Sequence, residues 1–477
     1  MNILIICSNC NKQPIAVMPI GACIAADTAL RAGHNVTVLD LMFVKNIERK
    51  LQQTLSTIQP DIVGISVRNI DNNDMKNPQM FFDDVSQLIQ MIRKKSKAQI
   101  ILGGAAISIM PQQLLRHFRT NIAVIENTET VFPQLLNALQ QKTSFKNING
   151  IAWIDNDIFR QNDIPATSAQ YSNNCFVPDF FRWLNVKSYL RNYSTVPVQT
   201  KRGCPYKCIY CTYAVGEGRQ YYLCKPAAVV NEIKKLASRG IRNIEFVDNV
   251  FNSPYEHAME ICSRLAREKL PVRLQSMELN PKFVDDALLT AMEKAGFVGI
   301  GLTAESADDT VLQSLGKDYS ARDVSCAAEI ISRHKLPCLW IFLLGGPGET
   351  PDTVLRTFTF ASCCIRKSDT AFFNVGIRIY PGTELEHIAR KQGTLRASEQ
   401  EMLSAVFYFS PKLDSQWLSE TLEQTVRENL NFIDPDSFTV TALSGILQLA
   451  YCFGIKQPLW KHTRLIRRGL QLLGKYK

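Results

Sequence analysis

The sequence predicts an α/β protein built from two successive strand-and-helix regions and a helical C-terminal segment. Residues 1–140 alternate short apolar runs with helical segments, which indicates a doubly wound, Rossmann-like parallel sheet. A second alternation begins at residue 196 and contains six strand-like runs, each followed by a helical run. We therefore divide the 477 residues into four parts: 1–140, 141–195, 196–390 and 391–477.

The N-terminal part has five strand-like runs, namely Ile3–Cys7, Val36–Leu39, Ile62–Val67, Ile100–Leu102 and Ile122–Ile125. Ligands of a doubly wound sheet lie beyond the carboxyl ends of its strands. Residues suited to such a site follow the third, fourth and fifth runs: Ser66, Arg68 and Asn69, then Gly103 and Gly104, then Glu126 and Thr128. Glycine there allows a ligand to approach the backbone closely. We expect a ligand site at this edge.

Residues 141–195 are predicted to be a linker with local structure. Ile151–Ile154 with a turn at Asn156-Asp157 indicates a hairpin. The second alternation follows, with strands expected at about 196–200, 243–247, 272–277, 297–303, 338–344 and 372–379. In parallel barrels the working residues lie at the carboxyl ends of the strands. Polar or glycine residues at these ends are Asp248, Gln275, Glu278, Glu305, Ser306, Gly345 and Gly346.

Three cysteines, Cys204, Cys208 and Cys211, follow the first strand of this second region. A 4Fe-4S cluster normally takes four cysteine ligands, so three thiolates leave one iron open to a substrate or cofactor. A structural zinc site would need a fourth ligand, and the nearest further thiol is Cys224, with no histidine before it. A disulfide framework is disfavoured because the fourteen cysteines lack regular spacing and no secretory leader is apparent, so we expect a reducing cytoplasm.

The Cys-x3-Cys-x2-Cys spacing, with Tyr210 before the third cysteine, resembles the radical S-adenosylmethionine (SAM) enzymes. The resemblance implies a partial (β/α)6 barrel, with the free iron chelated by the methionine moiety of SAM. It further implies that Asp248 accepts a bond from the ammonium group of SAM, that Gln275, Glu278, Glu305 and Ser306 suit its ribose, and that Gly345 and Gly346 lie against its adenine. A strand-end carboxylate can also cap a helix, and a Gly-Pro-Gly run is first of all a turn.

The polar loop after the third strand and the double glycine after the fourth resemble a cobalamin-binding domain. That family often carries Asp-x-His-x-x-Gly after the first strand, with the histidine bound to cobalt, but residues 9–14 lack it. The resemblance implies that Arg68 faces the cobalt, where a fixed cation that cannot ligate metal favours low coordination. The alternatives are that Arg68 pairs with Asp71 or Asp74, and that the sheet is a flavodoxin-like scaffold holding a flavin or nothing.

The net charge and the apolar content of the chain exclude few classes of function. The net charge of +10 suits several acidic partners, and no apolar run reaches the length of a transmembrane helix. Beyond residue 390 we expect a helical cap over the barrel mouth, with helices near 418–430 and 438–452. The last stretch, 460–470, is predicted to be a basic amphipathic helix that could meet an anionic surface. We found no DNA-reading motif and expect no nucleic-acid partner.

Together the two resemblances imply a cobalamin-dependent radical SAM methyltransferase that uses a 4Fe-4S cluster, SAM and cobalamin. It would pass a methyl group from SAM through methylcobalamin to a carbon or phosphorus centre of a small-molecule or peptide substrate. An external donor of the flavodoxin or ferredoxin type would supply electrons. One alternative is a non-methylating rearrangement or cyclisation by the same cofactors. The other is a cobalamin- or redox-sensing binding module without catalysis.

Overall fold

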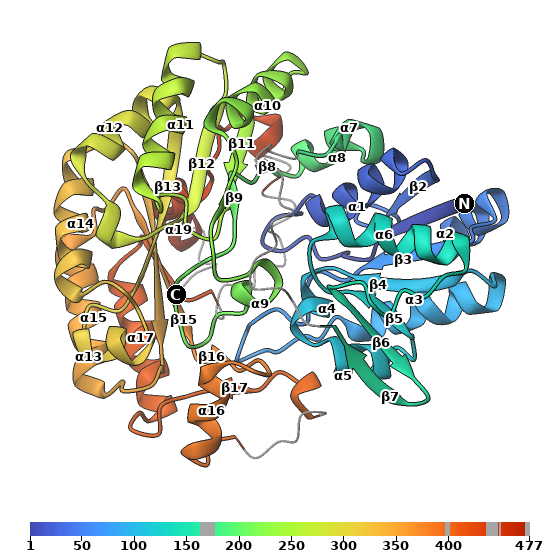
Figure 1. Ribbon diagram of the computed structural model, residues 1–477. Coiled ribbons are helices and arrows are strands. Elements are labelled where there is room, and N and C mark those ends of the chain that lie inside the picture. Colours follow the sequence, from blue (N-terminus) through green and yellow to red (C-terminus); the bar gives the residue numbers. More distant parts are fainter. Residues whose placement is uncertain (163–176, 396–400, 436–446, 448–449, 473–477) are drawn as a thin grey trace.

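Two α/β domains lie side by side in the computed structural model, which describes residues 1–162, 177–395, 401–435, 447 and 450–472 (Figure 1). The first domain, drawn from blue to teal, contains a seven-stranded sheet, and the second, drawn from green to orange, contains another. Both sheets are built mainly of parallel strands with helices packed on them. This arrangement confirms the predicted α/β class.

The first sheet has the order β2-β1-β3-β4-β5-β6-β7. Its parallel strands are β1 (Asn2–Cys7), β2 (Asn35–Asp40), β3 (Ile62–Ser66), β4 (Gln99–Gly103) and β5 (Ile122–Val124). The chain leaves β1 toward β2 on one side and later returns to β3 on the other, so the topological switch lies between β1 and β3. The covering helices are α1 (Ile20–Arg31), α2 (Ile47–Ile58), α3 (Phe82–Lys95), α4 (Ala105–Ile109), α5 (Pro111–His117) and α6 (Thr128–Gln141).

The predicted hairpin is present as β6 (Ile151–Asp155) and β7 (Ile158–Gln161). It is part of the first sheet, because β6 pairs antiparallel with β5. The boundary expected at residue 140 therefore falls inside this domain. Two short helices, α7 (Phe180–Trp183) and α8 (Val186–Arg191), then lead to the second domain. The indole of Trp183 donates to Asp27 of α1 at 2.6 Å, which ties the connection to the first domain.

The second sheet has the order β18-β15-β14-β13-β12-β11-β8, with every pair parallel. The six expected strands are β8 (Val196–Val198), β11 (Asn243–Phe246), β12 (Arg273–Leu279), β13 (Phe297–Glu305), β14 (Cys338–Leu344) and β15 (Thr370–Val375). Helices α10 (Pro226–Ser238), α11 (Tyr255–Glu268), α12 (Asp286–Ala295), α13 (Asp309–Ser314), α14 (Ala321–Arg333) and α15 (Pro351–Cys364) follow them. The seventh strand, β18 (Phe432–Ile433), was not predicted.

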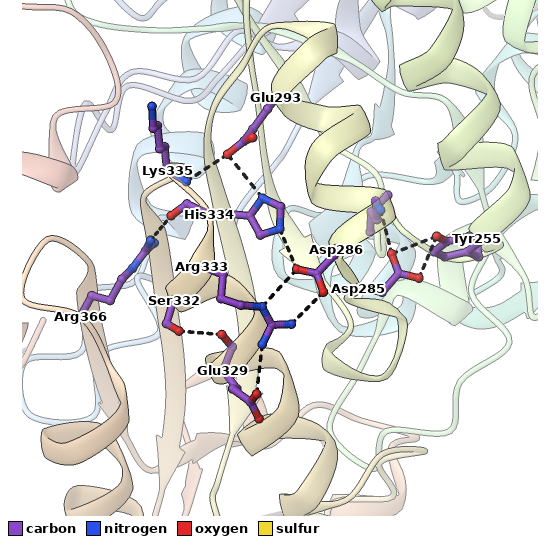
Figure 2. A network of polar contacts seen from close by, with 11 residues as sticks. Tyr255, Asp285, Asp286, Glu293, Glu329, Ser332, Arg333, His334, Lys335 and Arg366 are labelled. Atoms are coloured by element: carbon purple, nitrogen blue, oxygen red, sulfur yellow. Dashed lines mark hydrogen bonds and ion pairs between the residues drawn. The ribbon is translucent and has the colours of Figure 1, made fainter.

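A polar network links the outer barrel helices to one another (Figure 2). The guanidinium of Arg333, at the end of α14, contacts Asp286 of α12 at 2.7 Å and Glu329 at 3.0 Å. The adjacent His334 ring also contacts Asp286, at 3.0 Å. The carbonyl of His334 accepts a bond from Arg366, beyond α15. These contacts hold consecutive strand-and-helix units in register on the outside of the barrel.

The C-terminal part of the chain contributes to both domains. The segment with β16 (Ile377–Arg378), α16 (Glu384–Lys391) and β17 (Phe407–Tyr408) packs against the first domain, and α17 (Ser415–Glu428) precedes β18. The 3-10 helix η3 (Trp460–His462) and α19 (Thr463–Leu472) follow. Helix α17 matches the helix expected near 418–430, whereas the one expected at 438–452 lies largely outside the described residues. Among the described helices, none has the length and apolar character that a bilayer crossing requires.

The described C-terminal segment closes the end of the barrel formed by the first residues of its strands. Arg273, which begins β12, donates to the carbonyl of Gln457, and Thr370, which begins β15, donates to that of Trp460 at 2.7 Å. Residues 457–460 therefore do not form the expected cap over the mouth at the carboxyl ends, whereas Phe409 and Ser410 contact Gly345 at that end, after β14. The basic helix also differs from expectation, because Arg467 is fully buried and donates to backbone carbonyls, among them that of Val426 at 2.9 Å.

Candidate functional site

The three cysteines lie in a loop that leaves the first barrel strand. The short antiparallel pair β9 (Lys201–Arg202) and β10 (Tyr222–Leu223) closes this loop at its base, and α9 (Tyr213–Glu217) lies within it. Gly203 has φ +78°, and a Cβ there would come within 1.9 Å of the Gln220 carbonyl oxygen, so only glycine fits the tight start of the loop. A turn with a bond from Cys211 N to the Cys208 carbonyl, 3.2 Å long, brings the last two thiols together.

Electrostatics show that the three thiols are neighbours. The pKa of Cys211 is raised to about 11, mainly by burial, with the charges of Cys208 and Cys204 contributing to the rise. Burial likewise raises the pKa of Cys204, with Cys208 adding to it. Three thiolates at such close quarters need a cationic group to hold them. A 4Fe-4S cluster supplies that charge and suits an all-sulfur donor set, so these residues fit the cluster.

No three His, Cys, Asp or Glu side chains of the described residues surround one point as a single metal ion would need. A cluster differs in this respect, because its thiolates bind separate irons.

Tyr210, between the second and third cysteines, belongs to a buried charged group. Its hydroxyl donates to Glu305 Oε1 at 2.6 Å, and Lys317 Nζ lies 2.7 Å from both the hydroxyl and that oxygen. Burial opposes the charge on Lys317, but Glu305 and its neighbours keep the pKa of Lys317 well above its usual value. Glu305 ends β13 at φ +59°, a left-handed conformation that residues with side chains rarely adopt. Its Oε2 is buried without a partner in the described structure.

The loops after β1 and β3 line a cavity of about 180 Å³ at the carboxyl edge of the first sheet. Arg68 and Asn69 border it on one side, and Cys10 and Asn11 on the other, with residues of α3 closing it. This is the topological switch point, where ligands of such sheets bind. Ser66 ends β3 beside it and accepts a bond from Ser8 through its carbonyl at 2.8 Å.

The double glycine after β4 allows the loop after β4 to approach the backbone of the loop after β3 closely. Gly104 has φ +101°, and a Cβ there would lie 2.4 Å from the Val67 carbonyl oxygen. Gly103 instead has only the Val124 carbonyl, at 3.7 Å, near the place of a Cβ. Gly104 thus brings the loop after β4 against the loop after β3, while Gly103 leaves this edge uncrowded. Such an edge fits a flat, tailed cofactor such as cobalamin.

The fifth strand brings two more predicted residues to the same edge. Glu126 is buried just after β5, and burial raises its pKa to about 7. Thr128 begins α6. Glu129, the next residue, forms a bidentate ion pair with Arg202 beside the cysteine loop, with Arg202 NH1 at 2.6 Å from Glu129 Oε2. The carboxyl edge of the first sheet therefore faces the cysteine loop directly.

Other contacts hold the two domains together around this junction. Asp71 forms a buried ion pair with Arg378 at 2.7 Å, and Asn73 accepts a bond from Tyr380 at 3.0 Å. Asp74 is bonded to the backbone of Lys76 at 2.8 Å. Of the alternatives raised from the sequence, pairing of Arg68 with Asp71 or Asp74 is therefore not what the structure contains.

Arg68 instead faces the second domain. Its side chain is exposed, yet burial by surrounding protein lowers its pKa, while Tyr213 and Glu245 interact with its charge. Burial raises the pKa of Glu278 to about 8, with the charges of Glu305 and Glu245 among its causes. The charge of Arg68 thus interacts with Tyr213 and Glu245 of the second domain, and Glu278 interacts with Glu245 and Glu305 there. We call the region of Arg68, Glu245, Glu278 and Glu305 the interdomain space.

Several predicted SAM ligands have other partners. Both oxygens of Asp248 are bonded, to Thr200 Oγ1 at 2.5 Å and to the backbone N–H of Thr200 at 2.6 Å, and Lys201 Nζ lies 3.4 Å away. Ser306 lies fully buried between Thr357, at 3.2 Å, and the helix start at Asp308. We expected both to meet SAM, but the structure uses Asp248 to hold the base of the cysteine loop and Ser306 to pack α15.

The backbone N–H groups of the glycine turn after β14 also have partners within the protein. The N–H groups of Gly345 and Gly346 both donate to Glu349 Oε2, the latter at 3.0 Å. Gly345 packs against Phe409, which a Cβ would approach to 2.9 Å. These N–H groups are thus not free to bind adenine. Gln275, expected at a strand end, lies inside β12, where it contacts Glu245.

Glu245 and Lys317 were missed by sequence reasoning. Glu245 is an isolated carboxylate in an otherwise strand-like run, Asn243–Phe246, and that inward polar residue was the available signal. Lys317 carried no signal, because Tyr210 lies far away in the sequence. Glu129 lies in the predicted run from Glu126, but its pairing with Arg202 was not expected.

Comparison with known proteins agrees with this geometry. The model of the radical SAM superfamily matches residues 198–361, and the model of the B12 binding domain matches residues 14–136. These two matches confirm the predicted radical SAM and cobalamin-binding domains. The chain is a radical SAM enzyme with an N-terminal cobalamin-binding domain, so the cofactors of this class are a 4Fe-4S cluster, SAM and cobalamin.

Among curated proteins, an uncharacterised methyltransferase of Pyrococcus horikoshii is 25% identical over 373 residues, which cover 77% of each chain. The tryptophan 2-C-methyltransferase of Streptomyces laurentii is 23% identical over 422 residues, which cover 74% of this chain and 69% of the relative. Both likenesses span most of the two proteins. Both are named as methyltransferases.

Among solved structures, the radical SAM methyltransferase TsrM of Kitasatospora setae, with cobalamin and a 4Fe-4S cluster bound, superposes with a TM-score of 0.85. It is 21% identical, and the match covers 99% of both chains. The cobalamin-dependent SAM radical enzyme OxsB gives a TM-score of 0.70 at 14% identity, covering 99% of this chain and 75% of OxsB. At these identities the likeness establishes the shared fold.

Proposed function

We propose that this protein moves a methyl group from SAM, by way of cobalamin, to a carbon or phosphorus centre of a small-molecule or peptide acceptor. The observation that carries the proposal is that the cysteine loop lies against the carboxyl edge of the first sheet, where Arg202 pairs with Glu129 and Tyr213 interacts with Arg68. When bound, SAM would supply the methyl group, cobalamin would carry it, and the cluster would hold SAM. The names of the relatives, several of which are methyltransferases, support the same reading.

Each part of the chain has a task in this proposal. Cys204, Cys208 and Cys211 hold the cluster, and Tyr210 with Lys317 and Glu305 fixes the loop beside it. Asn69 lines the cavity at the carboxyl edge of the first sheet, and four residues at the ends of its strands would border the cobalamin slot with it: Ser66, Gly103, Glu126 and Thr128. Gly104 shapes this slot by bringing two loops together. Glu278 faces the shared space and is our candidate for contact with SAM.

Arg68 acts as a fixed cation on the cobalt side of this space. A guanidinium cannot ligate metal, and near cobalt it discourages a water ligand. The structure supports this role in two ways: Asp71 and Asp74 have other partners, and Arg68 reaches the interdomain space. In this proposal, an electron donor of the flavodoxin or ferredoxin type meets the protein in the cytoplasm.

The test is anaerobic reconstitution with iron, sulfide and cobalamin, followed by incubation with dithionite as the electron donor, [methyl-13C]SAM and a small-molecule cell extract. Label in an extract component other than methionine, detected by mass spectrometry, is the expected result. SAM cleavage to 5'-deoxyadenosine and labelled methionine, with no label in any other component, would instead favour the non-methylating rearrangement. A fully loaded protein that consumes no SAM would contradict catalysis and favour a sensor.

A further inference from the structure

Glu245 and Gln275 form a pair of side chains on adjacent strands inside the barrel. The two residues are register partners of β11 and β12. Glu245 Oε2 accepts bonds from Thr195 Oγ1 at 2.6 Å and from Gln275 Nε2 at 3.2 Å. Both bonds fall on the same oxygen. The carboxylate also fixes the orientation of the glutamine amide, because the NH2 group of Gln275 has to face it.

This pair leaves two acceptor atoms without a donor. Gln275 is only 8% exposed, and its Oε1 is buried with no hydrogen-bond partner in the described structure. The second oxygen of Glu245, Oε1, also receives no bond from the described residues, but this side chain is only partly buried. For the buried Gln275 Oε1, the missing donor is unfavourable. Such atoms persist where a ligand supplies the missing donors.

The pair is separate from the cysteine loop but lies within electrostatic range of the first domain. The charge of Arg68 lowers the pKa of Glu245, and Glu245 in turn influences Arg68. Gly299 of β13 is the register partner of Gln275. Because Gly299 has no side chain, Pro458 and Trp460 of the C-terminal segment pack against it, each 2.9 Å from where a Cβ would lie. The floor beneath the pair is thus apolar and partly aromatic, while Tyr210, Glu305 and Lys317 form a separate group beside the cluster.

We propose that Glu245 and Gln275 bind a protonated amine of the methyl acceptor. An ammonium group has three N–H donors and a positive charge. It can therefore donate to Gln275 Oε1 and to Glu245 Oε1, and the carboxylate of Glu245 balances its charge. Glu278 adds a further carboxyl group to the same space. This inference rests on the proposed function and narrows its acceptor to an amine-bearing small molecule or peptide. The ammonium of SAM is the competing source of the same chemistry.

The experiment measures binding to the reconstituted protein at pH 7 by calorimetry. The probes are three amines, each matched with its neutral alcohol: tryptamine with tryptophol, phenethylamine with 2-phenylethanol, and putrescine with 1,4-butanediol. We expect at least one amine to bind about tenfold more tightly than its alcohol, and Glu245→Gln to abolish that difference. The control Glu423→Gln changes the charge equally on exposed α17 and should keep the difference. Absence of any amine preference in the unmodified protein overturns the proposal, as does a preference that survives Glu245→Gln.

Gln275→Met serves as a second variant, because it removes the free Oε1 and keeps the bulk of the side chain. We expect it to reduce the amine preference about threefold or more. Binding of SAM alone is measured on the same variants. Equal losses of SAM and amine binding in Glu245→Gln would assign the pair to the cofactor and overturn the proposal. Failure of labelled SAM to pass its methyl group to cobalamin would refute the proposed function instead, and the amine measurement would still stand.

Discussion

Charged side chains gather in two regions of this protein, on the outside of the barrel helices and in the space between the domains. On the outside, Asp286 lies between Arg333 and His334 (Figure 2). The hydrogen bond from Arg333 holds the pKa of Asp286 below its usual range. Inside, burial raises the pKa of Glu278 to about 8 and raises that of Glu245 as well.

The outer and inner carboxylates differ in their pKa because they differ in exposure to solvent and in the number of cations around them. The exposed carboxylates have basic partners within 3.0 Å and water around them, so they are satisfied without any ligand. Among the described residues, the cations that act on the three inner glutamates are Lys317 and Arg68, and Lys317 is already paired with Glu305. Carboxylates that lack counter-ions in a low-dielectric place mark functional sites more often than structural ones. The outer network serves the fold, and the inner group is left for ligands.

The largest effect is expected from removing a cluster ligand. Cys208→Ala should lower SAM-dependent turnover by about three orders of magnitude or more, because two thiolates cannot hold the cluster in place. Iron content and visible absorbance after anaerobic reconstitution measure the loss. The matched control is Cys326→Ala, since Cys326 is exposed on α14. Retained iron and turnover in Cys208→Ala would remove the basis of the inner site.

Lys317→Met should be the most destabilising change in the inner group. It leaves Glu305 buried without its cation, which we expect to lower the free energy of unfolding by about 3–5 kcal/mol. Urea unfolding near neutral pH measures it, with Lys235→Met as control because Lys235 forms an exposed pair with Glu232. Equal losses in the free energy of unfolding for Lys317→Met and Lys235→Met would show that the inner and outer ion pairs contribute equally to stability.

Glu278→Gln should change how stability depends on pH. The pKa of Glu278 in the folded protein, about 8, lies above its value of 4.5 in an unfolded chain. The folded state therefore holds this proton more tightly, and its contribution to stability is full below about pH 4.5 and is lost as pH rises through 8. Between pH 6 and pH 8.5 the unmodified protein should lose about 2 kcal/mol relative to the variant.

Unfolding midpoints across that range measure this difference. Glu256→Gln, on the exposed face of α11, is the control and should leave the pH dependence unchanged. Parallel curves for the unmodified protein and Glu278→Gln would mean that Glu278 does not carry a raised pKa.

The smallest effect is expected in the outer network. Asp286→Asn weakens exposed contacts, so the melting temperature should change by no more than about 1 °C near neutral pH. The pKa of Asp286 is lowered in the folded state, so the small contribution of this residue is present at neutral pH and is lost as pH falls. Differential scanning calorimetry at two pH values measures this. A drop as large as that of Lys317→Met would contradict the proposed division between the regions.

Local patterns were enough to predict most of the architecture and the centre of the site. The strand-like runs from Ile3 to Ile125 and the six barrel strands follow from short-range apolar patterning. The cysteine spacing predicted the radical SAM domain, which the family match confirms. The short strand β18 escaped prediction because two paired residues leave no periodic signal. Residues such as Asp248 and Ser306 were given ligand roles because a strand-end position does not reveal which partners a side chain finds.

The sequence by itself determined the two domains, their order and the three thiolates, because each depends on residues close together in the chain. Only the tertiary structure decided which side chains from distant parts of the chain lie near one another. It placed Arg68 opposite Glu245, paired Lys317 with Glu305 and brought the C-terminal segment under the barrel. These contacts join residues that the fold alone makes neighbours, and burial then sets their charge. No local pattern encodes either effect.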